Sequence, residues 1–248
     1  MKILVCLSCV PDTTTKINFK ENDTLFDDQG VQFVINPNDE FGLTRAIWLK
    51  EKEGATVDVL HVGEANADPI LRKALAIGAD KAIRIDTPAI DAFVVADQIS
   101  SYLQAHPYDL IITGRESIDY NGSMVHGLVA SKCDMTFINT CVQLDIEGST
   151  ATATREMDGG METLTAQLPL IIGSQKGLVE ETDLRIPNMR GIMQARQKPL
   201  DVIPAVESKA MSTIKGFEKP APKAAVKLIP ADDIDQLIDL LQNEAKVL

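Results

Sequence analysis

The stretch spanning residues 109–131, DLIITGRESIDYNGSMVHGLVAS, constrains the fold more than any other part of the chain. A continuously apolar run at 110–112 stops at Gly114, and a polar loop then leads into a helix-like pattern. In open α/β sheets nucleotides bind in loops of this kind, at the carboxyl ends of strands. An anion could be held at the following helix start by backbone N–H groups and short polar side chains. The candidates are Ser117, Asp119, Asn121, Gly122 and Ser123.

The same local pattern would also suit an ordinary strand-to-helix turn, so this segment alone does not decide between the two interpretations. No Walker-type Gly-Lys-Ser/Thr follows the strand. The loop therefore gives no indication of phosphate hydrolysis.

Short apolar runs rich in branched residues recur along the first half of the chain, as expected of parallel strands covered on both faces. They span residues 3–7, 57–62, 82–85 and 110–112. Patterns of helix length lie at about 38–53, 67–77, 90–104 and after Asn121. This alternation predicts right-handed βαβ crossovers and a doubly wound, mostly parallel α/β sheet.

The pattern changes after residue 137. Segments at 140–146, 151–157 and 162–166 predict a small antiparallel ribbon region, and 170–173 predicts a further buried strand. From Gly177 onward the sequence loses periodicity and gains proline, which predicts an extended arm. An amphipathic helix is predicted at 232–247, and it could dock on its own domain or on a partner.

These patterns predict a folded domain followed by an extended C-terminal arm. We expect a nucleotide-binding α/β domain over residues 1–203, and over 204–248 a C-terminal arm and helix that wrap a partner subunit. With 248 residues and 45% hydrophobic content, the chain can build a sizeable core.

The net charge of -12 argues against binding to nucleic acid or to anionic membrane surfaces, because both would repel the chain. The sequence has no apolar run of membrane-spanning length, so no membrane insertion is expected. Its four cysteines and the absence of a signal-like N-terminus fit a reducing, cytoplasmic location without disulfides.

Residues with catalytic chemistry are scattered. Cys6 and Cys9 have the spacing of a redox or metal pair, but Cys6 lies in an apolar strand and no matching Cys/His pair is near in sequence. The three histidines lack the spacing of a metal site, and no Ser/His/Asp set is evident. The sequence therefore predicts a binding pocket without evident proton-transfer machinery.

The segment Asn36-Pro37-Asn38-Asp39-Glu40 is typical of a helix start, and a capped helix is its simplest interpretation. The functional alternative places Asn36 and Asn38 against an adenine or ribose edge, near the ends of neighbouring strands. A third strand end, Val62-Gly63, would permit close approach of a ligand to the backbone.

Several separated motifs resemble the β (small) subunit of electron transfer flavoproteins, over residues 2–203. The motifs are Val10-Pro-Asp12, Ile35-Asn-Pro37, Leu49-Lys-Glu-Lys52, Ala74-Leu-Ala-Ile-Gly-Ala-Asp80, Gly114 to Asp119, Arg155-Glu-Met-Asp-Gly-Gly160, and Ile192-Met193 to Arg196. The resemblance implies an adenine nucleotide alpha hydrolase-like fold. It also implies a heterodimer in which a larger α subunit carries the redox-active FAD and the β subunit binds AMP structurally.

Carried over position by position, the resemblance implies a cofactor pocket made of strand ends and loops. Its residues are Cys6, Asn36, Pro37, Asn38, Asp39, Val62, Gly114, Arg115, Glu116, Ser117, Ile118, Asp119, Asn121, Gly122, Ser123 and Met124.

The resemblance also implies an electron carrier rather than an enzyme with its own substrate turnover, and it implies partners in electron transport. Flavin-dependent dehydrogenases such as the acyl-CoA dehydrogenases of fatty acid oxidation would supply electrons, and a quinone-linked oxidoreductase would receive them. The family's recognition loop corresponds to residues 185–193, with Met189 as its apolar anchor. Met189 packing on its own domain is the structural alternative.

Two other functions stay open. In flavin-bifurcating relatives a second FAD replaces AMP in the same pocket, and Pro11-Asp12-Thr13-Thr14 resembles that branch. The Arg155 to Gly160 motif instead resembles the ordinary carriers, so we favour AMP. A stand-alone nucleotide-binding module of the stress-response type would use a similar fold as a homodimer.

Overall fold

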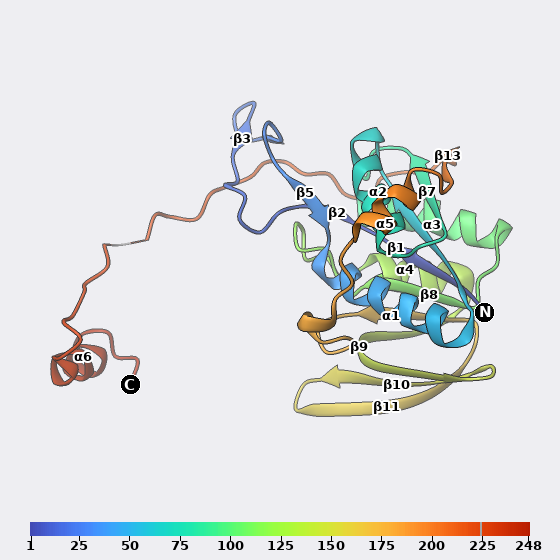
Figure 1. The fold of residues 1–248 in the computed structure, drawn as a ribbon. Helices are drawn as coiled ribbons and strands as arrows, with labels where there is room; N and C mark the ends of the chain where they lie inside the picture. The colour runs from blue at the N-terminus through green and yellow to red at the C-terminus, as the bar shows by residue number, and fades with distance from the viewer. Residues whose placement is uncertain (224) are drawn as a thin grey trace.

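The computed structural model describes residues 1–248 apart from residue 224. Its centre is a nine-stranded sheet in the order β11-β10-β9-β12-β8-β1-β6-β7-β13 (Figure 1). The strands of this sheet are β1 (Lys2–Cys6), β6 (Thr56–Val62), β7 (Lys81–Asp86), β8 (Leu110–Gly114), β9 (Thr136–Glu147), β10 (Thr150–Met157), β11 (Gly160–Gln167), β12 (Leu170–Ser174) and β13 (Leu200–Pro204). The run from β9 to β13 is parallel, which confirms the expected doubly wound α/β class.

Helices cover both faces of this sheet. They are α1 (Pro37–Glu53), α2 (Asp68–Ile77), α3 (Ala92–Ala105), α4 (Val125–Cys133) and the short α5 (Met189–Ala195). Alternate residues of β1 serve the two cores: Ile3 and Val5 pack with α1 and α2, whereas Leu4 packs with α3 and α4. The four predicted helices are thus present, with ends within a few residues of the expected ones.

The chain reverses its direction of winding between β1 and β8. From β1 it moves outward through β6 and β7, and after α3 it returns to place β8 on the other side of β1. The crossover helices diverge at such a switch point, so a crevice opens beyond the carboxyl ends of the two strands. The candidate functional site lies there.

The predicted antiparallel region is a three-stranded extension of the same sheet. Strand β9 pairs in parallel with β12 on one side and antiparallel with β10 on the other, and β11 forms the edge. The register shifts where Thr154 and Arg155 face β9, next to Thr140, which has a left-handed φ of 49°. This ribbon lies at the bottom of Figure 1.

The expectation that an arm without regular structure begins at Gly177 is wrong. Strand β13 adds to the sheet edge in parallel with β7, and α5 packs on α2. Both elements are short and depend on partners distant in sequence, so local periodicity does not indicate them. The expected division after residue 203 stays a prediction, and β13 ends one residue beyond it, at Pro204.

The arm beyond β13 is anchored on its own chain at several places. Gln98 of α3 exchanges hydrogen bonds with the Val206 backbone at 2.8 and 2.9 Å. Further on, Phe217 stacks on Phe19 with ring centroids 4.6 Å apart. Phe19 belongs to a small hairpin of β3 (Phe19–Lys20) and β4 (Leu25–Phe26); a second hairpin joins β2 (Cys9–Pro11) to β5 (Phe33–Ile35).

The arm ends in a helical segment that lies apart from the domain (Figure 1). Instead of one α-helix over 232–247, it forms α6 (Ile234–Asp239) and a wider π-helical turn (Leu240–Glu244). Apolar residues of its predicted stripe are exposed, including Ile234, Leu237 and Ile238.

Candidate functional site

A cavity of about 320 Å³ lies beyond the carboxyl ends of β1, β6 and β8, next to the start of α3. The two strands of the switch point, β1 and β8, form its floor, and the loop between β8 and α4 forms one wall. Predicted site residues that line the cavity are Cys6, Asp39, Val62, Gly114, Glu116, Ser117, Asp119, Gly122, Ser123 and Met124.

Asp39, near the start of α1, joins the ends of the two central strands. Its Oδ2 accepts a hydrogen bond from the Ser8 N–H at 2.6 Å, and its Oδ1 accepts one from the Gly114 N–H at 2.7 Å. Burial raises the pKa of Asp39 to about 7, against the opposing effect of these hydrogen bonds. A Cβ at Gly114 would lie 2.3 Å from Asp39 Oδ1, which explains why glycine occupies this position.

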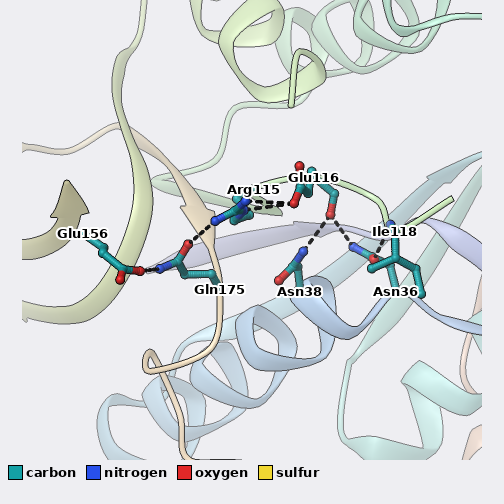
Figure 2. A network of polar contacts seen from close by, with 7 residues as sticks. All are labelled: Asn36, Asn38, Arg115, Glu116, Ile118, Glu156 and Gln175. Atoms are coloured by element: carbon teal, nitrogen blue, oxygen red, sulfur yellow. Dashed lines mark hydrogen bonds and ion pairs between the residues drawn. The ribbon is translucent and has the colours of Figure 1, made fainter. Parts of the chain in front are cut away.

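Asn36 and Asn38 hold the loop that follows β8 (Figure 2). Both side-chain amides donate to the Glu116 carbonyl, at 2.9 and 3.0 Å, and Asn36 Oδ1 accepts from the Ile118 N–H at 3.2 Å. Neither asparagine is among the residues that line the cavity. Their direct contact with adenine or ribose stays a prediction, whereas their support of the loop backbone is observed.

A side-chain network connects this loop to the antiparallel ribbon (Figure 2). Arg115 pairs with Glu116 at 2.9 Å and donates to Gln175 Oε1 at 3.1 Å. Gln175 in turn donates to Glu156 of β10 at 2.5 Å. Arg115 therefore faces the ribbon instead of the cavity.

The loop before α4 has an unusual backbone. Asn121 and Ser123 both have left-handed φ angles of 48°, and the Asn121 N–H donates to the Ser117 carbonyl at 2.8 Å. Helix α4 then begins at Val125 without a side-chain cap. Because the first N–H groups of a helix have no partner within it, this end of α4 can hold an anion.

The predicted site residues thus divide into two groups. Asn36, Pro37, Asn38, Arg115, Ile118 and Asn121 do not line the cavity. Sequence reasoning missed several residues that do, among them Ser8, His61, Asp91, Thr113, His126, Ser212 and Ile214. Asp91 could have been found as the N-cap of α3, but nothing local indicates that Ser212 of the arm reaches this place.

Four carboxylates line the cavity, from Asp39, Asp91, Glu116 and Asp119, and among the described residues no lysine or arginine does. An anionic ligand would therefore depend on backbone N–H groups. Burial raises the pKa of the Cys9 thiol to about 11, and the pKa of Cys6 is raised still further by burial. Both thiols are protonated near neutral pH, which argues against a nucleophilic or redox role.

Fold and site together define a class: a doubly wound α/β protein with a small-molecule cavity at its topological switch point. Comparison with known proteins is more specific. Residues 23–208 match the family described as "Electron transfer flavoprotein domain". The chain belongs to this family, and its relatives are β subunits.

Two of these relatives match over their full length. Electron transfer flavoprotein subunit beta of Bacillus subtilis (strain 168) is 34% identical, and the mitochondrial subunit beta of Arabidopsis thaliana is 33% identical, with 100% of each chain covered. The subunit beta of Homo sapiens is 29% identical over 94% of this chain and 95% of the human one. This membership implies flavin-dependent electron transfer together with an α-subunit partner.

Among the described residues, none of the helices has the length and apolar character of a membrane span.

Met189, the predicted recognition anchor, is the first residue of α5, and 76% of its surface is exposed.

Proposed function

We propose that this chain is the small subunit of a heterodimeric electron transfer flavoprotein and binds AMP as a structural ligand in the cavity at the switch point. The single observation that carries the proposal is the cavity itself, where three strand ends and the start of α4 converge. Its volume of about 320 Å³ lies at the lower end of the range for small-molecule pockets, which suits a mononucleotide.

The lining residues fit the two ends of such a ligand. Val62, Val95 and Ile99 provide an apolar wall for a base. Gly122 and Ser123, with the start of α4, provide backbone N–H groups and a hydroxyl for a phosphate. The network through Asn36, Asn38 and Glu116 keeps this loop in place before a ligand binds.

Electron transfer would take place on FAD carried mainly by the α subunit, and this chain would shape the flavin environment and the docking surface. When bound, the flavin supplies the redox chemistry, and the protein supplies orientation and electrostatics. We propose flavin dehydrogenases, including acyl-CoA dehydrogenases, as electron donors and a quinone-linked oxidoreductase as acceptor, in the cytoplasm.

The exposed apolar surface of residues 185–193 supports a docking role. Ile186, Met189 and Met193 are 81%, 76% and 67% exposed, which is unusual for side chains of this size and type. Methionine adapts its shape to a partner's pocket.

We expect Met189→Asp to slow reduction of the heterodimer by a dehydrogenase about tenfold. Met161→Asp, at a 65% exposed site on the ribbon, is the matched control and should leave the rate unchanged.

The nucleotide content of the heterodimer tests the central proposal. The chain is expressed together with a flavoprotein α subunit, and the ligands released by denaturation are separated and counted. Equal amounts of AMP and FAD support the proposal. FAD in twofold excess over heterodimer, without AMP, would show the bifurcating form instead. An ATP-binding homodimer that takes up no flavin subunit would show the stand-alone module.

A further inference from the structure

His126 is a buried imidazole that lies beside the side chain of Asn139. It lies in the first turn of the nine-residue helix α4, lines the cavity and is only 2% exposed. Its ring packs edge-on against Phe137 of β9, with centroids 4.8 Å apart. Within the part of the chain that the structure describes, His126 makes no hydrogen bond that meets normal geometry.

A second buried polar atom lies beside it without a partner. Asn139, two residues after Phe137 on β9, has an enclosed Oδ1 with no hydrogen-bond partner among the described residues. Burying a polar atom without a partner costs free energy, so Asn139 Oδ1 favours a donor from the neighbouring His126 ring. An imidazolium can donate from both ring nitrogens, to Asn139 Oδ1 and to a ligand.

The carboxylates around the cavity disfavour an anion, so an anionic group requires a nearby positive charge. Carboxylates of Asp39, Asp91, Glu116 and Asp119 line the cavity, and the only basic side chains among its lining residues are His61 and His126. His61 is already engaged, with Nδ1 2.8 Å from the Leu7 carbonyl. The positive end of the α4 dipole lies at His126, where it favours an anion and disfavours an unpaired imidazolium, so protonated His126 requires the negative charge of a ligand beside it.

We propose that His126 binds the phosphate of the nucleotide in its protonated form, at the start of α4, and takes up a proton when the nucleotide binds. The inference rests on the proposed nucleotide function and adds the residue that recognises the phosphate. It predicts that phosphate binding is stronger at lower pH, because the imidazolium is then already present.

Other groups near His126 agree with this coupling. Burial lowers the pKa of His126, while Asn139 and the carboxylate of Glu116 act in the opposite direction. Helix α3 contributes Asp97, which is paired with Lys132 near the far end of α4 at 2.7 Å. Strand β9 presents the uncharged Phe137 and Asn139, and β12 carries no titratable residue. A bound phosphate would add negative charge and raise the pKa of His126, which requires proton uptake.

Calorimetric titration tests this with the nucleotide-free heterodimer and two probes, AMP and adenosine. From about pH 8 to about pH 6.5, AMP affinity should rise about tenfold, while adenosine affinity should stay constant. The AMP heat measured in two buffers of different ionisation enthalpy should show net proton uptake. AMP's own phosphate titrates near pH 6, so the comparison between variants isolates the protein's part.

His126→Gln should keep adenosine affinity but lose the proton uptake and most of the pH slope. His106→Gln, at the exposed end of α3, is the matched control and should behave as the wild type. Asn139→Ser provides a second variant with the histidine intact, and it should reduce the AMP affinity and the pH slope.

Two results would overturn the role of His126 and leave the pocket proposal intact. One is that adenosine and AMP bind with the same pH dependence. The other is that the His126→Gln variant keeps the wild-type pH slope of AMP affinity. Failure of both probes to bind would overturn the nucleotide function and this inference together.

Discussion

The sheet and the C-terminal arm contain similar apolar residues in opposite environments. Ile111 and Ile112 of β8 are fully buried between helices of the same chain. In the arm, Val226 and Leu228 are 80% and 86% exposed. Burial of an apolar side chain contributes roughly 1.5–3 kcal/mol, so the sheet gains from its own chain a stabilisation that these arm residues lack. From this difference we propose that the outer arm packs on a surface of another molecule.

The arm itself has an inner half that contacts the domain and an outer half that is exposed. Its inner half, residues 205–219, is held by Gln98, by Phe19 and by Asp91, whose Oδ2 accepts hydrogen bonds from the N–H groups of Met211 and Ser212 at 2.6 and 2.9 Å. Because Ser212 also lines the cavity, this inner half belongs functionally with the domain. Residues 225–248 form the free half, and Lys227 pairs there with Glu244 at 3.0 Å.

The largest effect is expected where the domain is packed most tightly. Gly114→Ala would place a Cβ 2.3 Å from Asp39 Oδ1 and 2.9 Å from Asn36 Nδ2. We expect a loss of about 3 kcal/mol in the free energy of unfolding, measured by urea denaturation, together with loss of bound nucleotide. Gly122→Ala is the control for the unfolding free energy alone, because its Cβ would meet no atom within 4 Å but Gly122 belongs to the proposed phosphate site. Equal stability of the two variants would show that the strand ends are not rigid.

Asp39→Asn should have the next largest effect. An asparagine can accept only one of the two N–H groups that the carboxylate accepts, so we expect a loss of about 2 kcal/mol in unfolding free energy. The pKa of Asp39 is raised in the folded state, to about 7, so its contribution to stability decreases as pH rises from about 4 to 7. Urea denaturation should therefore show a larger difference between variant and wild type near pH 4 than near pH 7. A constant difference would contradict the raised pKa.

The sequence predicts the strands at the buried centre of the sheet better than the strand at its edge. The strands around Ile3, Val59 and Ile111 follow from local apolar runs, because parallel strands covered on both faces need continuous apolar residues. Strand β13 does not, because Leu200 pairs with Ala82, more than a hundred positions earlier. Such pairing depends on the whole sheet and leaves no local periodicity.

The site residues also fall into those that local sequence predicts and those that depend on contacts distant in sequence. The loop from Gly114 to Ser123 is recognisable because its residue types suit a strand-to-helix turn that binds anions. The contribution of His126 and Ser212 depends on tertiary packing against β9 and α3, and local sequence does not encode it. Asn36 donates to the Glu116 carbonyl, and its contact with a ligand stays a prediction, because residue type indicates a polar contact without naming its partner.

Phe217→Ala should separate the inner arm from the domain. Loss of its stacking on Phe19 removes an interaction worth about 1 kcal/mol. Limited proteolysis with trypsin should then cut faster after Lys215, which precedes Gly216, while the urea midpoint of the domain stays unchanged. Val226→Ala, in the free half, is the control and should leave the cleavage rate as in the wild type. Unchanged cleavage in Phe217→Ala would show that the hydrogen bonds of Gln98 and Asp91 suffice to hold the inner arm.

The smallest effect on the isolated chain is expected for Leu228→Ser. A side chain that is 86% exposed contributes little, so the unfolding free energy should change by less than about 0.5 kcal/mol. If the free half covers an α subunit, the same change should weaken heterodimer formation about tenfold, measured by titration of labelled subunits. Ile17→Ser, at a 42% exposed site outside the arm, is the control for lost apolar surface. Identical heterodimer affinities for the wild type and both variants would show that Leu228 does not meet the partner, and the comparison between buried sheet and exposed arm would then lose its functional meaning.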